Sequence, residues 1–136
     1  MKKIFTLSAL IFASAFFLSG CIKTDYPYYD QSYWLSKERG EVVYSGTYCN
    51  YYVIETYYGF TIVRGWGSYK PLERSIVYGD FSYTGTKEMY NRTTGTVFTG
   101  TITDTRLTYL EAQEILDYYC PLGGKNQTRE FVKTGQ

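Results

Sequence analysis

The sequence predicts a mainly β fold: a small antiparallel β barrel or rolled sheet of about five or six strands with one C-terminal α-helix. Three observations support this prediction. β-Branched and aromatic residues gather in short runs, as they do in strands. Glycines interrupt these runs every eight to twelve residues or so, the spacing typical of barrels and sandwiches. One stretch near the C-terminus has its apolar residues at helical spacing.

The composition bounds the functions that this chain can have. Its 136 residues are 44% hydrophobic and 20% charged, which is typical of a single globular domain. The chain contains no His, the usual general base and a frequent metal ligand. Nucleophile pairs that need His and most zinc sites are therefore excluded, and we expect neither an enzyme nor a bound cofactor or metal.

The first twenty residues have the pattern of an export signal. Lys2 and Lys3 precede an apolar run over residues 4–18, which ends in small residues. The run is about fifteen residues long, shorter than the roughly twenty that a membrane-spanning helix needs. Without these two lysines, the 14 basic residues fall to 12 against 13 acidic ones. No basic stripe remains, so we do not expect nucleic-acid binding.

Leu18-Ser19-Gly20-Cys21 resembles the lipobox of bacterial lipoproteins, in which the Cys is joined to diacylglycerol and becomes the first residue of the mature chain. The resemblance implies that residues 1–20 are a lipoprotein signal peptide and that lipid on Cys21 tethers the domain to a membrane of the bacterial cell envelope. Ile22 replaces the Asp typical of lipoproteins kept at the inner membrane of enteric bacteria, which favours the outer membrane. The alternative is an ordinary secretory signal followed by an incidental Cys.

Residues 21–39 are predicted to be the lipidated Cys and a tether. This segment is polar and aromatic, contains Pro27, and shows no sustained period of a strand or helix. The alternative is an extra docked strand, because the three apolar residues 33–35 need burial. The folded domain is expected over residues 40–136.

Six strands are predicted inside that domain, and tight connections between them indicate an antiparallel meander. The connections are Tyr58-Gly59, Thr84-Gly85 and residues 92–95. In the last strand, Phe98 and Ile102 share one face, so that this strand should be half buried. The predicted strands cover about residues 41–45, 49–57, 60–66, 76–83, 86–91 and 96–103.

A helix over about residues 109–119 follows. Thr108 and Glu111 have the capping-box spacing that begins a helix. An apolar stripe at helical spacing should cover one side of the sheet, and Cys120-Pro121 with Gly123-Gly124 should end the helix. The stripe consists of Ala112, Ile115, Leu116 and Tyr119. In the polar tail, Phe131 and Val132 could add an edge strand or fray.

The cysteine count predicts a disulfide. If lipid occupies Cys21, only Cys49 and Cys120 remain, in a compartment where disulfides persist. A bond between them would tie a central strand to the end of the helix. The alternatives are two buried thiols or a redox pair, although no Cys-x-x-Cys motif supports redox work.

The candidate binding residues are aromatic. The chain has 17 Tyr and two Trp, and exposed aromatics of this kind stack on sugars or anchor protein interfaces. We expect such roles for Tyr57 and Tyr58 at a hairpin end and for Trp66 and Tyr69 in the loop after the next strand. The alternative is that these side chains only fill the core or coat strand faces.

Two classes of function fit these residues. The favoured one is a non-enzymatic module that docks an envelope protein, including an inhibitor or immunity role, and it predicts an exposed apolar patch with a polar rim. The other is a module that binds carbohydrate or peptidoglycan, which needs two coplanar aromatics beside amide or carboxylate groups. An enzyme would need two carboxyl groups converging in a cleft, and carboxylates such as Glu55, Asp80, Glu88 and Asp104 are predicted to be solvated instead.

Overall fold

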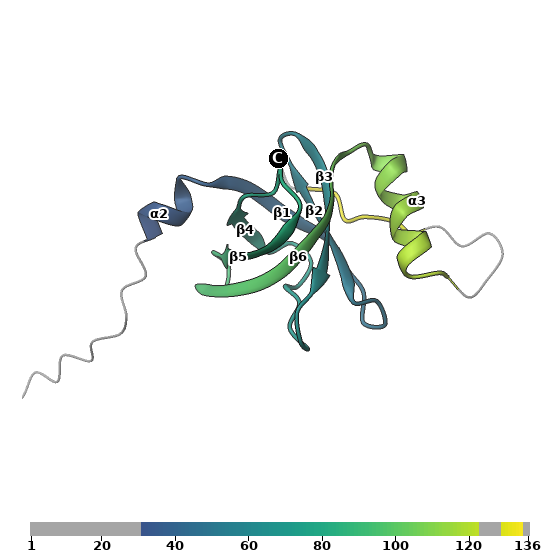
Figure 1. Ribbon diagram of the computed structural model, residues 1–136, viewed down its shortest axis with the longest axis horizontal. Helices are drawn as coiled ribbons and strands as arrows, with labels where there is room; N and C mark the ends of the chain where they lie inside the picture. Colours follow the sequence, from purple (N-terminus) through teal and green to yellow (C-terminus); the bar gives the residue numbers. More distant parts are fainter. Residues whose placement is uncertain (1–30, 123–128, 135–136) are drawn as a thin grey trace, which may run out of the picture.

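The computed structural model describes residues 31–122 and 129–134 (Figure 1). The predicted lipobox, with Cys21, and the glycine pair at 123–124 lie outside these residues. The described part contains no helix that is long and apolar enough to span a membrane. Its elements are α2 (Gln31–Leu35), β1 (Glu38–Ser45), β2 (Tyr51–Thr56), β3 (Gly59–Gly65), β4 (Ile76–Gly79), β5 (Gly85–Asn91), β6 (Thr96–Leu107) and α3 (Tyr109–Tyr119).

The six strands form a closed antiparallel barrel, as predicted, in the order β1-β2-β3-β6-β5-β4. The chain builds it from two three-stranded meanders, β1-β2-β3 and β4-β5-β6. The β3–β6 and β1–β4 pairs close the barrel. The longest strand, β6, follows the curve of the barrel wall and leads into α3, which lies against the outside (Figure 1).

The strand boundaries differ most from the prediction at the ends of β4 and β6. β4 ends at Gly79 instead of continuing to residue 83, because the chain turns and Phe81 enters the barrel interior, where it is fully buried. β6 continues to Leu107 instead of ending at residue 103, because its second half pairs with the start of β3. Register shifts in that pairing show that it is irregular there.

The N-terminal segment is also different. Residues 31–35 form the short helix α2, and β1 begins at Glu38. The Trp34 ring stacks on the buried Tyr90 of β5, with ring centroids 6.1 Å apart. The predicted tether therefore does not extend through residues 31–39, and the docked-strand alternative is wrong for residues 33–35. Contact with a buried tyrosine partly buries Trp34, whereas Tyr33 and Leu35 stay exposed.

The first hydrophobic core fills the barrel. Gly100 of β6 allows the walls to close, because a Cβ atom there would lie 2.7 Å from side-chain atoms of Tyr52, Val63 and Met89. The strand alternation predicted for β6 is confirmed, since Phe98 and Ile102 both point into this core. Its members are Val42, Tyr52, Ile54, Val63, Val77, Phe81, Met89, Phe98 and Ile102.

The second core lies between the outside of the barrel and α3. The predicted capping box is present, with the Thr108 hydroxyl accepting from the Glu111 amide and the Glu111 carboxylate accepting from the Thr108 amide. Phe131 is buried here, and the Val132 amide donates to the Val43 carbonyl. The C-terminal tail therefore docks at this point instead of fraying. The buried members are Val43, Cys49, Val53, Ile62, Ala112, Leu116 and Phe131.

The predicted Cys49–Cys120 disulfide is present, with Cα atoms 5.7 Å apart. It joins Cys49, two residues before β2, to Cys120, the C-cap residue of α3. The bond therefore fixes the end of the helix to the barrel wall.

Candidate functional site

The four candidate aromatics lie where the sequence placed them, but they do not form one patch. Tyr57 and Tyr58 make the turn between β2 and β3, and Trp66 and Tyr69 follow the end of β3. The seven residues of β3 separate the two pairs, a span of about 23 Å at ~3.3 Å per residue. They are therefore two separate candidate surfaces.

The Tyr57–Tyr58 turn is exposed. Its side chains are 93% and 60% exposed, and their rings meet edge to face with centroids 5.3 Å apart. The Arg106 guanidinium lies 5.9 Å from the Tyr58 ring, in cation–π range. Neither Tyr57 nor Tyr58 lines either of the two hollows described below.

Trp66 and Tyr69 border a hollow of about 440 Å³ at one end of the barrel. Trp66 is 59% exposed and Tyr69 is 41% exposed. The two residues pair across a tight turn in which Gly67 has φ +63°, a conformation that favours glycine. The hollow is lined by Trp66, Tyr69, Thr96, Val97, Phe98 and Thr99, and we call these residues the barrel mouth.

The barrel mouth lies next to the inner core. The Tyr69 ring lies over that of the core residue Phe98, with centroids 5.4 Å apart. The Tyr69 hydroxyl accepts a long hydrogen bond of 3.4 Å from the amide of Asn91, which is completely buried. Tyr69 therefore covers the end of the core and is held there by both ring and hydroxyl contacts.

The Tyr52 hydroxyl lies in the core without a hydrogen-bond partner in the described part of the chain. Burial raises the pKa of Tyr52 well above its ordinary value, and the nearby Tyr69 raises it further. Tyr52 therefore remains a neutral phenol at physiological pH, so it is unsuited to act as a base or nucleophile.

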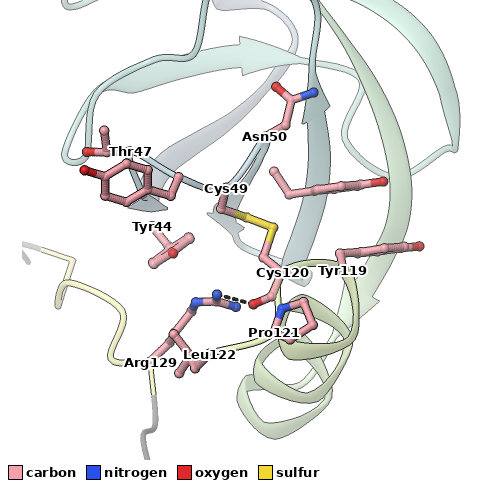
Figure 2. Close-up of a pocket in the computed structure, with 12 residues that line it drawn as sticks. Tyr44, Thr47, Cys49, Asn50, Tyr119, Cys120, Pro121, Leu122 and Arg129 are labelled. Atoms are coloured by element: carbon pink, nitrogen blue, oxygen red, sulfur yellow. Dashed lines mark hydrogen bonds between the residues drawn. A yellow bond between two sulfur atoms is a disulfide. The ribbon is translucent and has the colours of Figure 1, made fainter. Parts of the chain in front are cut away.

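A second hollow, of about 540 Å³, lies beside the disulfide (Figure 2). Its wall includes Tyr51 and Tyr119, whose rings are parallel within 1° and have centroids 4.3 Å apart. The Tyr119 hydroxyl donates to the Asp104 carboxylate at 3.0 Å. Partial burial raises the pKa of Tyr119, and the bond to Asp104 adds to this effect. Because the two rings fill the space between them, no sugar ring can enter that space.

Arg129 closes the end of α3 at this hollow. Its guanidinium donates to the carbonyls of Leu116 and Cys120 and pairs with Asp117 at 3.2 Å, as Figure 2 shows for the Cys120 contact. It also lies 5.3 Å from the Tyr44 ring centroid. Carbonyls at the end of a helix have no partners within the helix, and this buried cation supplies them. Arg129 is not predictable from the sequence, because nothing in the polar tail indicates which helix end it reaches.

The carboxylates considered for catalysis have other partners or are separated. Asp80 pairs with Lys87 at 3.4 Å, and Asp104 accepts from Tyr119. Glu55 lies on β2 and Glu88 on β5, strands that are not neighbours in the barrel. Among residues 31–122 and 129–134, no group of three or more His, Cys, Asp or Glu could hold a metal ion.

Comparisons with protein-family models, with curated proteins and with solved structures found no match, so no residue roles are transferred to this chain from a relative.

Proposed function

We propose that this protein is a lipoprotein of the bacterial cell envelope, anchored through Cys21, whose barrel mouth docks a protein partner without catalysing a reaction. The observation that carries this proposal is the exposure of Trp66 and Tyr69 beside a hollow at the end of the barrel. Large aromatics that remain exposed next to a cavity are typical anchors of protein interfaces.

Two independent features support an envelope location. The first is the lipobox Leu18-Ser19-Gly20-Cys21, which implies lipid on Cys21. The second is the Cys49–Cys120 disulfide, because such bonds persist outside the cytoplasm and are rare within it. Ile22 after the lipidated Cys favours delivery to the outer membrane.

The chemistry of the barrel mouth favours a protein over a glycan. Its six lining residues are aromatic, aliphatic or hydroxyl-bearing, and none is charged. Sugar sites combine an open aromatic face with amide or carboxylate groups, whereas the Asn91 amide is buried behind Tyr69. The parallel pair Tyr51–Tyr119 is stacked on itself. An apolar patch with a hydroxyl rim fits a docked polypeptide better.

Photo-crosslinking in bacterial cells tests the docking role. A photoreactive amino acid is placed at position 66 or 69, with position 57 as the matched exposed-tyrosine control. We expect one recurrent protein adduct from positions 66 and 69 and not from position 57. Adducts that carry only glycan would overturn protein docking and favour carbohydrate or peptidoglycan binding.

A separate experiment tests the anchor. Cys21→Ser removes the lipid attachment site, so we expect the protein to leave the membrane fraction. Metabolic labelling with a radioactive fatty acid should mark the natural chain and not the variant. Unchanged membrane retention of the variant would contradict lipid anchoring.

A further inference from the structure

β6 has neighbouring strands on both sides over only part of its length. On one side, Thr96–Ile102 pair with β5 in an unbroken register. On the other side, pairing with β3 begins only at Gly100, opposite Gly65. Within the described part of the chain, Thr96–Thr99 therefore have a strand on one side only. We call these four residues the open edge.

The hydrogen bonds of Gly65 show which backbone groups point outward from this edge. The Gly65 amide donates to the Asn50 carbonyl at 2.7 Å, so the peptide groups of Gly65 face away from β6. Facing residues in an antiparallel ladder either exchange both hydrogen bonds or exchange none. Gly100 therefore directs its N–H and C=O toward β5. Because the direction alternates along a strand, Val97 and Thr99 direct theirs to the open side.

The open edge is short, but it lacks the other features that usually protect exposed strands. Natural edges carry charged residues, prolines or bulges that prevent pairing with another chain. Residues 96–99 are Thr-Val-Phe-Thr, all favoured in strands, and their register with β5 contains no bulge. The hollow of the barrel mouth runs along these same four residues, so space for another segment lies beside the edge.

Positive charges flank both ends of the open edge, and one exposed acidic residue, Glu88, lies on β5 opposite Thr99. Arg64 pairs with Thr101, just beyond one end, and Arg92 lies in the turn before Thr96 at the other end. Both arginines are exposed. The residues between them are uncharged, so a complementary segment has an uncharged centre and acidic residues near its ends.

We propose that the open edge of β6 accepts an extended segment of a partner protein as an added β-strand, and that Trp66 and Tyr69 contact the side chains of this segment. This inference rests on the proposed docking function and names its mode. Unpaired N–H and C=O groups that repeat every second residue match another extended backbone. A glycan or a lipid surface does not offer that repeat of donors and acceptors.

The first experiment measures amide hydrogen exchange in the free protein, using the full chain purified from membranes in detergent and labelled with ¹⁵N. The amides of Thr96 and Phe98 bond to β5 and should exchange slowly. Those of Val97 and Thr99 should exchange fast. Slow exchange at Val97 and Thr99 in the monomer would mean that another segment of the chain already covers the edge, which overturns the proposal. Slowing that increases with protein concentration would identify a second copy as the occupant, with the same consequence.

The second experiment uses peptides selected from a phage-displayed library of random nonapeptides. We expect a bound peptide to slow exchange specifically at Val97 and Thr99. Val97→Pro removes the outward donor while leaving the β5 bonds of Thr96 and Phe98, and it should weaken peptide binding about tenfold or more. Thr99→Lys places a charge on the edge and should act in the same direction even if the proline variant folds poorly. The matched control Tyr57→Ala should bind as the natural protein does.

Selection of no binding peptide, or peptides that leave the Val97 and Thr99 amides fast, would overturn the added-strand mode. The docking role itself is tested separately by the crosslinks from positions 66 and 69. A recurrent crosslinked protein together with fast exchange at Val97 and Thr99 in the complex would therefore reject this inference and retain the proposed function.

Discussion

The α3 side of the barrel and the barrel mouth both carry aromatic residues, but they use them differently. On the α3 side, Tyr51 stacks on Tyr119, Tyr44 lies against Arg129, and Phe131 is buried. At the mouth, Tyr69 contacts Phe98, while Trp66 has no ring contact in the described part of the chain. The first region uses these three aromatics to hold a helix, and the second leaves Trp66 facing solvent.

The difference extends to how strongly each region is tied to the barrel. The α3 side has a disulfide, a capping box and a buried arginine at the end of the helix. The loop at the mouth has no covalent tie. It is held by the Trp66–Tyr69 pair, the long bond from Asn91 to Tyr69, and bonds from the Lys70 ammonium to the carbonyls of Gly46 and Cys49. Exposure alone therefore does not identify a site. An exposed aromatic that contributes little to stability is the better candidate for binding.

The largest effect should come from removing the disulfide that ties the α3 side. In the double variant Cys49→Ala/Cys120→Ala, the 71-residue separation is no longer closed in the unfolded chain. The chain-entropy model then gives a loss of about 4 kcal/mol in the free energy of unfolding. Urea unfolding followed by circular dichroism measures the loss. An unchanged midpoint would show that the covalent tie adds nothing to the packing of α3.

The next effect should come from the core beneath the helix. Leu116 is completely buried between α3 and the barrel. Leu116→Ala leaves a cavity there and should lower the free energy of unfolding by about 3 kcal/mol. The matched control is Leu110→Ala, because Leu110 lies on the same helix but is exposed. Equal losses in the two variants would contradict the assignment of Leu116 to this core.

The structure of the α3 side could be predicted because the sequence patterns that determine it are local. The spacing of Thr108 and Glu111 predicts where α3 begins, and the positions of Ala112 and Leu116 predict which face is buried. With Cys21 assigned to lipid, only one disulfide was available. Strand alternation and tight turns likewise indicated the meanders.

The features that escaped prediction depend on contacts between distant parts of the chain. The open edge exists because β3 ends at Gly65 while β6 begins four residues before their first pair. The residues of β3 do not indicate where β6 begins, and the residues of β6 do not indicate where β3 ends. Arg129 reaches Leu116 and Cys120 only because the tail folds back, and α2 forms where Trp34 meets Tyr90. No local sequence pattern predicts these contacts.

A smaller effect should come from the helix cap. Thr108→Ala removes the hydroxyl that accepts from the Glu111 amide and should cost about 1 kcal/mol in the free energy of unfolding. Thermal unfolding followed by circular dichroism is the measurement, and Thr108→Ser should retain most of the stability. Equal stability of the Ala and Ser variants would show that the cap contributes nothing.

The same cap predicts a pH dependence. Hydrogen bonding with the backbone of Thr108, and to a lesser degree with its side chain, lowers the pKa of Glu111 below its ordinary value. The ionised carboxylate therefore favours the folded state above the pKa of Glu111 in the unfolded chain, and this contribution is lost as pH falls through the lower pKa in the folded chain. Glu111→Gln should reduce the fall in melting temperature between neutral and acidic pH. An identical pH profile for the variant would contradict the assignment.

The smallest effect on stability, and the sharpest test of the comparison, should come from Trp66→Ala at the mouth. Its ring is 59% exposed, so the free energy of unfolding should change by no more than about 0.5 kcal/mol. Tyr57→Ala is the control, because Tyr57 is an even more exposed aromatic at the other end of β3. Crosslinking from position 69 should lose the partner in the Trp66 variant and keep it in the Tyr57 variant. If both variants keep the partner, Trp66 is not its anchor. If Trp66→Ala instead lowers the free energy of unfolding as much as Leu116→Ala does, the Trp66 side chain is structural. The contrast between a stabilising α3 side and a binding mouth then fails.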